Sequence, residues 1–416
     1  MTQTRSLIFL FLAVVIIGIA GCDNKTPVGA LDSPAWADHL KLPKVSFTPD
    51  QQLNIITYYE YLPQEIFDLF TRTYGTVIVP TLITSNEEML ELLQKNPDKY
   101  DLLTPSDYMV TKMHNSGLLH RLNQENLPNM ENLDEDLRRM EYDQGLHYCV
   151  PLFRTSLGIA FNISYISGIP RNWGFIDEQL RNEYLTYRIG ITKEMRFAMG
   201  ISLQFLGYSP NTTNPKEIIE ARDQLIYSIK RYGFSLLEEE NNDESLINNN
   251  ILLGVVWNGS AASALQKNPN IRFLLPEGPV LVTIDNAVIS AQSKRTRTAE
   301  LFVNYLLTPQ VAARITNYNY FPNSISASAP FTKRSIRTGP GFLFPEEENR
   351  LLLKDLGPSI KLYEDAWTQV LQAKTPETLV KLPLPKGGFF KGDTQTVDFT
   401  KKFGEKDMQT KKPEAP

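Results

Sequence analysis

The chain has 416 residues, of which 42% are hydrophobic and 21% are charged, and its formal net charge at pH 7 is −5. This length is enough for two globular lobes and exceeds what one hydrophobic core usually supports. Because the globular part contains no basic patch or stripe, we exclude nucleic acid as a partner. The four histidines share no metal-ligand spacing, so the sequence predicts neither a zinc or iron site nor a cofactor.

Residues 1–22 have the pattern of a signal peptide. Arg5 gives a basic start, residues 7–17 are apolar, and small residues lead up to Cys22. The apolar run is too short to span a membrane comfortably. Small residues directly before a cysteine resemble the bacterial lipobox, in which Cys22 is acylated and becomes the new N-terminus. The alternative is an ordinary secreted signal peptide with Cys22 as an incidental thiol.

Residues 23–52 are polar and punctuated by prolines, which predicts a tether between a lipid anchor and the first strand. Asp23 resembles the signal that keeps bacterial lipoproteins at the inner membrane. The expected location is therefore the periplasm, with the protein tethered to the inner membrane. The only other cysteine, Cys149, lies in an apolar stretch and is expected to be a buried residue without a disulfide partner.

Residues 53–151 are predicted to form a first lobe in which strands and helices alternate. Residues 53–57 have the β-branched, half-apolar pattern of a strand, and a helix is expected at 64–73. Further strands are expected at 76–80 and 100–103, each followed by a helix. This alternation predicts a parallel, doubly wound α/β lobe.

Tyr58, Tyr59 and Tyr61 directly follow the first predicted strand. Ligands bind at the carboxyl ends of strands in open α/β sheets, so these rings are candidates for a binding surface. The alternative is that they only cover the edges of the core, as most aromatic residues do. The turn at 104–108 follows the third predicted strand in the same way.

A change of pattern predicts a second lobe at 152–278. Residues 151–161 form a long apolar stretch, broken by Arg154, that is expected to cross from one lobe to the other. A buried strand at 252–256 leads into Trp257, in a second turn of the kind that carries a ligand site.

A strand expected at 280–289 begins the return to the first lobe, which takes residues 279–325. Residues 326–385 are expected to add C-terminal helices to the second lobe. Residues 386–416 have almost no apolar period, which predicts a flexible tail. Longer helices are expected at 194–206, 215–232 and 299–307.

Signatures of catalysis are absent from the sequence. It contains no Gly-x-Ser-x-Gly elbow, no His-Glu-x-x-His pair, no P-loop, and no Gly-x-Gly-x-x-Gly after a strand. We therefore do not expect an enzyme.

Four ordered segments of the chain together have a specific pattern. They are Tyr58-Tyr59-Glu60-Tyr61-Leu62-Pro63, Asp101-Leu102-Leu103-Thr104-Pro105-Ser106, Leu206-Gly207-Tyr208-Ser209-Pro210-Asn211-Thr212-Thr213-Asn214-Pro215 and Val256-Trp257-Asn258-Gly259-Ser260-Ala261. With these segments the chain resembles one known family, the periplasmic spermidine/putrescine-binding proteins of bacterial ABC importers, over about residues 53–372. The resemblance implies a type II periplasmic-binding-protein fold, in which two α/β lobes joined by a hinge close on a polyamine and deliver it to a permease.

In that family the methylene chain lies against aromatic rings and the ammonium groups bind carboxylates. Both contacts suit a polyamine, because ring faces attract cations and a desolvated ammonium group needs a counter-charge. By resemblance, Trp257 lies along the chain and Asp285 holds an ammonium group. The ligand-binding residues that the resemblance implies are Tyr58, Tyr59, Tyr61, Ser106, Tyr108, Glu194, Trp257, Asp285 and Tyr320.

The sequence also departs from the family pattern. Of an acidic pair one helical turn apart, Glu194 is kept, whereas Phe197 takes the second position. Thr283 stands where an aromatic residue is usual, and Arg154 replaces an aromatic residue near the crossing. A buried arginine would repel an ammonium group, or would bind a ligand carboxylate in a bidentate manner.

These departures leave two alternatives open. In the first, the fold and the transport role are kept, but the cargo is a zwitterion or an anion seated on Arg154 or Arg196. In the second, the protein is a ligand-sensing lipoprotein that reports to a membrane receptor without transport.

Overall fold

The computed structural model describes residues 40–180, 182–238, 242–386, 388 and 389. The chain divides into Met1–Leu40 and Lys41–Pro416, and the fold is that of the second unit. Cys22, the rest of the predicted signal peptide and residues 390–416 of the predicted tail lie outside the described residues. Among the described helices, none combines the length and apolar character that crossing a bilayer requires.

The first lobe begins with alternating strands and helices, as predicted. β1 pairs in parallel with β2 and β3, whereas β9 joins this sheet antiparallel to β3, so the sheet is mixed. The elements are β1 (Gln52–Tyr58), α1 (Gln64–Tyr74), β2 (Val77–Ile83), α2 (Asn86–Lys95), β3 (Leu102–Leu103) and α3 (Asp107–Asn115).

Local sequence explains where these helices begin and end. α1 starts after Pro63 and stops at Gly75, whose φ of 76° is the left-handed conformation that glycine adopts without strain. α2 is capped by Ser85, which accepts a hydrogen bond from the Glu88 backbone N–H at 3.2 Å. The Glu88 carboxylate reaches back to the Thr84 backbone N–H at 2.9 Å.

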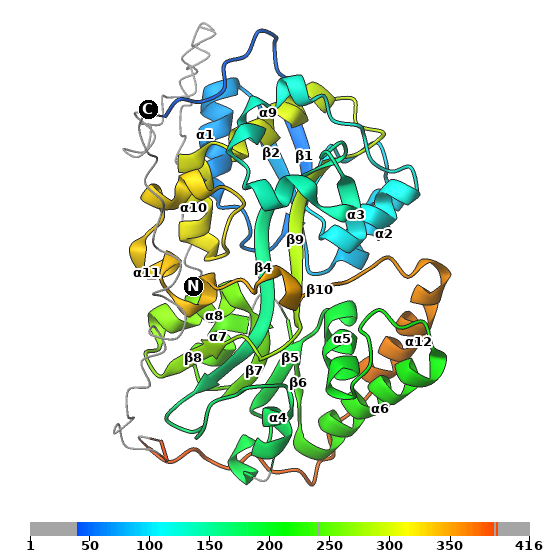
Figure 1. Cartoon of the computed structure of the whole chain (residues 1–416), viewed down its shortest axis with the longest axis vertical. Coiled ribbons are helices and arrows are strands. Elements are labelled where there is room, and N and C mark those ends of the chain that lie inside the picture. The colour runs from blue at the N-terminus through cyan, green and yellow to red at the C-terminus, as the bar shows by residue number, and fades with distance from the viewer. Residues whose placement is uncertain (1–39, 181, 239–241, 387, 390–416) are drawn as a thin grey trace, which may run out of the picture. The chain divides into compact units, whose positions relative to one another are not determined.

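Two long buried strands, β4 (Cys149–Asn162) and β9 (Val280–Ile289), connect the two lobes (Figure 1). β4 pairs antiparallel with β9 over its first half and with β7 and β8 over its second half. The change of partner falls between Ser156 and Leu157, within the apolar stretch 151–161. The strand order is β2-β1-β3-β9-β4-β7-β5-β6.

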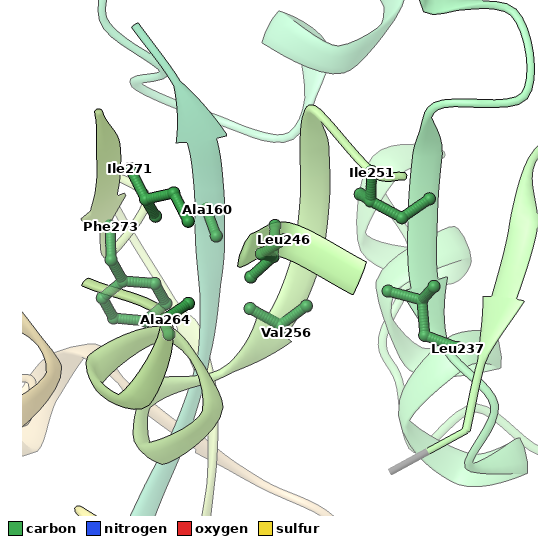
Figure 2. Packing of buried hydrophobic residues seen from close by; sticks show 9 residues of the cluster. Ala160, Leu237, Leu246, Ile251, Val256, Ala264, Ile271 and Phe273 are labelled. Carbon is green, nitrogen blue, oxygen red and sulfur yellow. The ribbon is translucent and has the colours of Figure 1, made fainter. Parts of the chain in front are cut away.

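The second lobe is built on the second half of β4. In its core, Phe273 lies close to Ala160 and Ala264 (Figure 2). Gly158 makes this packing possible, because a Cβ atom there would lie 2.4 Å from the Phe273 ring. The elements are α4 (Gly174–Gln179), β5 (Ile189–Thr192), α5 (Met195–Phe205), α6 (Pro215–Tyr232), β6 (Ser235–Leu237), α7 (Asn242–Ile247), β7 (Leu253–Trp257), α8 (Asn258–Lys267) and β8 (Ile271–Leu274).

The remaining chain covers both lobes. Strand β10 pairs in parallel with the start of β9, and α12 packs against α5 and α6. Phe389, within the segment predicted as a flexible tail, packs edge-on against Tyr165 and Tyr184 with ring centroids 5.7 and 4.8 Å apart. The elements are α9 (Thr296–Leu306), α10 (Pro309–Asn319), α11 (Arg334–Arg337), β10 (Arg350–Leu352) and α12 (Ile360–Leu371), with short 3₁₀ turns between the elements that follow α10.

Candidate ligand-binding site

The carboxylate of Asp285 is the centre of the candidate site. Asp285 lies on the connecting strand β9 and is only 6% exposed. The Tyr61 hydroxyl donates to its Oδ2 at 2.6 Å, and the Ser106 hydroxyl donates to its Oδ1 at 2.8 Å. Asn86 holds Ser106 in place through bonds of 3.1 Å to its hydroxyl and 3.0 Å from its backbone N–H. The turns after β1 and β3 therefore deliver both hydroxyl donors to one carboxylate.

Burial also shifts the titration of Asp285. It raises the pKa of this carboxyl to about 6, against the opposing effect of the hydrogen bonds from Tyr61 and Ser106. Among the described residues, no basic side chain lies within 4.0 Å of its oxygen atoms. A cation placed beside Asp285 would favour the ionised form and would provide the counter-charge that a buried carboxylate requires.

The second lobe supplies the opposite wall of the site. Trp257, at the end of β7, donates its indole N–H to Glu194 Oε1 at 2.8 Å. Its ring packs edge-on against Phe197, with centroids 4.6 Å apart. Gly259 follows at the start of α8, where a Cβ atom would lie 2.5 Å from the ring of Phe321 in the first lobe. Glycine is therefore needed where the two lobes approach each other beside Trp257.

Aromatic rings surround Tyr61 and form the apolar part of the site. Tyr58 and Phe153 pack edge-on against Tyr61 at 5.7 and 4.8 Å, and Phe321 lies at 6.1 Å. These walls enclose a cavity of about 20 Å³, which has room for about one water molecule. A larger ligand therefore requires the lobes or rings to move apart. The cavity is lined by Tyr58, Tyr61, Ser106, Thr155, Glu194, Trp257, Thr283, Asp285 and Phe321.

Six of the nine residues predicted from the sequence meet at this cavity, and three lie elsewhere. Tyr59 is 40% exposed and, together with Tyr320, lines a neighbouring cavity of about 250 Å³ that shares Tyr61 and Phe321 with the first. Tyr108 is buried behind the site, where its hydroxyl donates to Glu87 at 3.1 Å and its ring packs on Phe197. The six that meet are Tyr58, Tyr61, Ser106, Glu194, Trp257 and Asp285.

Both candidate anion-binding arginines have other contacts. Arg154 binds Asp136 through two nitrogen atoms at 2.7 and 2.9 Å, and Asp134 at 2.7 Å. Arg196 is buried, lies over the Tyr108 ring at 5.3 Å and donates to a backbone carbonyl oxygen at 3.1 Å. Neither arginine lines the cavity around Asp285.

Sequence reasoning missed Phe153, Thr155 and Phe321. Side chains alternate along a strand, so residues 153 and 155 of β4 face the same side. This alternation could have predicted that both side chains face the site. Phe321 directly follows Tyr320, whose φ of 66° turns the chain at the end of α10. No pattern in the sequence indicates which of these two neighbouring rings enters the site.

The described residues contain no group of three or more His, Cys, Asp or Glu side chains placed to hold a metal ion. Cys149 is buried with a free thiol, as predicted. Burial raises the pKa of this thiol well above its usual range. The chemistry available around Asp285 is therefore that of a carboxylate, hydroxyl groups and aromatic rings.

The chain is similar to known binding proteins over most of its length. The spermidine/putrescine-binding periplasmic protein 1 of Haemophilus influenzae is 28% identical over 338 residues, which cover 80% of this chain and 92% of that protein. The putative spermidine/putrescine ABC transporter of Listeria monocytogenes superposes with a TM-score of 0.72 at 24% identity. That superposition covers 77% of this chain and 99% of the other.

The Tp0655 (TpPotD) lipoprotein of Treponema pallidum superposes with a TM-score of 0.65 at 25% identity, over 77% of this chain and 99% of its own. These likenesses confirm the predicted type II periplasmic-binding-protein fold. The model of the bacterial extracellular solute-binding protein family matches residues 68–336, more than half of the sequence. The chain is thus a member of the bacterial extracellular solute-binding protein family.

Proposed function

We propose that this protein is the substrate-binding component of an ABC importer and that it captures a polyamine between its lobes. Hinge closure around the cargo and release at the permease account for this role without a chemical step. The names of the relatives from Haemophilus influenzae and Listeria monocytogenes, which refer to spermidine and putrescine, support the same role.

The observation that carries the proposal is the Asp285 carboxylate. It is buried at the junction of the lobes, receives two hydroxyl hydrogen bonds, and has no described basic side chain within 4.0 Å. An ammonium group provides both the missing positive charge and further N–H donors. An anionic ligand would instead place a second negative charge beside a buried carboxylate.

The surrounding rings suit the carbon chain of a polyamine. Tyr58, Tyr61, Trp257 and Phe321 provide apolar walls, and their faces attract cations by roughly 0.5–2 kcal/mol each. Glu194, on the opposite lobe, places a second carboxylate at the same cavity. A molecule with two ammonium groups would therefore contact both lobes and favour the closed form.

The contacts of the arginines argue against a zwitterionic or anionic cargo. Arg154 is neutralised by Asp134 and Asp136, and their charges together with the hydrogen bonds raise its pKa despite burial. Arg196 lies over the Tyr108 ring and does not line the cavity. A ligand carboxylate would have to displace an existing partner of Arg154.

We further propose that Cys22 carries a lipid anchor and that the start of the predicted tether joins it to the binding lobes at the inner membrane. The end of the predicted tether instead packs on the first lobe, where Thr298 donates to the Asp50 carboxylate at 2.6 Å and Gln52 begins β1. The small residues that precede Cys22 support the lipid anchor, and the relative from Treponema pallidum is described as a lipoprotein. Anchoring at the membrane would keep the binding protein close to its permease and raise its effective concentration there.

Calorimetry on the purified protein tests the proposal. The panel consists of putrescine and spermidine, a zwitterionic amino acid of similar length, and a dicarboxylate. We expect the amines to bind and the other two compounds to give no heat above dilution. Tight binding of the zwitterion or the dicarboxylate, with no binding of either amine, would overturn the proposal.

A further inference from the structure

A second buried carboxylate, Asp107, lies behind the site. It is the first residue of α3 and is only 2% exposed. Its Oδ1 accepts bonds from the Tyr108 backbone N–H at 2.7 Å and from the Thr283 hydroxyl at 3.1 Å. Its Oδ2 accepts a bond of 3.3 Å from the Ile284 backbone N–H. Asp107 therefore binds the two residues of β9 that precede Asp285.

Asp107 lies near another buried acid, Asp285. Among the described residues, no basic side chain lies within 4.0 Å of its oxygen atoms. Burial raises the pKa of Asp107 to about 7, although the hydrogen bonds from Ile284, Tyr108 and Thr283 oppose this increase; the charge of Asp285 adds to it. The titratable groups that face it are Asp285 on β9, Tyr142 in the 3₁₀ turn Glu141–Asp143, and Cys149 on β4.

We propose that Asp107 is a positioning residue that couples amine binding to the release of a proton from the Asp107–Asp285 pair. This inference rests on the proposed function. Two carboxylates that share a buried region without a cation retain protons, because each negative charge disfavours the other. An ammonium group on Asp285 supplies the positive charge. The carboxyl O–H bond then breaks, its electron pair stays on the oxygen, and the proton passes to the solvent buffer.

The linkage between proton release and amine binding gives the sign and the size of the pH effect on amine affinity. At pH 6.5 a carboxyl with a pKa of about 7 is roughly three-quarters protonated, and one with a pKa of about 6 is roughly one-quarter protonated. If the ammonium group lowers both pKa values well below 6, binding releases about one proton per ligand. Amine affinity then rises as the pH increases through about 6 to 7 and becomes constant above that range.

The Asp107→Asn variant removes the negative charge of Asp107 but keeps most of its hydrogen bonds. The asparagine carbonyl oxygen can still accept the bonds from Tyr108 and Thr283, so only the longest bond, to Ile284, is lost. Spermidine binding is measured by calorimetry at pH 6.5 in two buffers with different ionisation enthalpies, which gives the number of protons released. Asp98→Asn, which removes the same charge from an exposed site in the first lobe, is the matched control.

We expect the parent and Asp98→Asn to release about one proton, and Asp107→Asn to release about a quarter of a proton or less. At pH 8 we expect Asp107→Asn to bind spermidine on the order of tenfold more weakly, because one attractive charge is missing. A purely structural role would weaken binding equally at every pH and leave the proton count unchanged. An unchanged count in Asp107→Asn would overturn the inference.

A second measurement needs no variant and covers the case in which Asp107→Asn does not fold. Carbon-13 NMR of the aspartate carboxyl groups in the parent follows their titration with and without spermidine. We expect two buried carboxyls to titrate between about pH 6 and 7 and to shift below 5 with the ligand. Two carboxyls that titrate below 5 without ligand would overturn this inference alone, whereas a parent that binds no amine at any pH would overturn the proposed function and this inference together.

Discussion

The Asp285→Asn substitution tests the role of the central carboxylate most sharply. The amide keeps one oxygen atom as an acceptor, and the Tyr61 and Ser106 hydroxyls can rotate to suit its NH₂ group, so the fold should be preserved. A bound ammonium group would then lack its buried counter-charge, at a cost on the order of 3–5 kcal/mol. This corresponds to a roughly hundredfold to several-thousandfold increase in the dissociation constant.

Calorimetry with putrescine and spermidine measures this change, and thermal melting confirms that the variant is folded. Asp98→Asn is the control, because it removes an exposed carboxylate from the same lobe and should bind like the parent. If Asp285→Asn binds polyamines as tightly as the parent does, Asp285 does not hold the ammonium group. In that case loss of carboxylate binding in an Arg154→Ala variant would identify an acidic cargo instead.

Three further predictions concern other parts of the chain. Glu194→Gln keeps an acceptor for the Trp257 indole N–H but removes a negative charge. We therefore expect roughly tenfold to hundredfold weaker polyamine binding in a calorimetric titration; an unchanged affinity would mean that Glu194 does not bind the ligand. Arg154→Met leaves Asp134 and Asp136 without their main partner. Because these ion pairs are only partly buried, the unfolding midpoint in a thermal melt should fall by only a few °C; a midpoint equal to that of the parent would show that the ion pairs of Arg154 do not stabilise the fold. Cys22→Ser should abolish lipid attachment and release the protein into periplasmic washes, and mass spectrometry that finds an unmodified N-terminus in the parent would contradict the anchor.

Much of the fold could be predicted because local signals agree with each other. The helix expected at 215–232 begins and ends where α6 does, since Asn214 caps it, Pro215 occupies its first turn and Gly233 ends it. The crossing strand was visible as an apolar run that is too long for one ordinary strand. That β9 enters the first sheet antiparallel was not predictable, because strand direction depends on the path of the whole chain.

The candidate site was predicted less completely, and the errors have physical causes. Tyr59 and Tyr320 are each one or two residues away from rings that do enter the cavity, and turn geometry decides which ring points inward. Sequence reasoning did not identify the partners of Arg154, because Asp134 and Asp136 belong to a segment of 3₁₀ turns without apolar periodicity. Asp107 at a helix start has an ordinary explanation in helix capping and the helix dipole, so sequence alone did not single it out.

The most direct test of the central claim is a crystal structure of the protein grown with spermidine. We predict that one ligand nitrogen lies about 2.7–3.2 Å from an Asp285 carboxylate oxygen, with the carbon chain against the Trp257 ring. The lobes should also enclose a larger cavity around Tyr61 than the 20 Å³ described above. A ligand bound outside this cavity, with Asp285 still held only by Tyr61 and Ser106, would contradict the account.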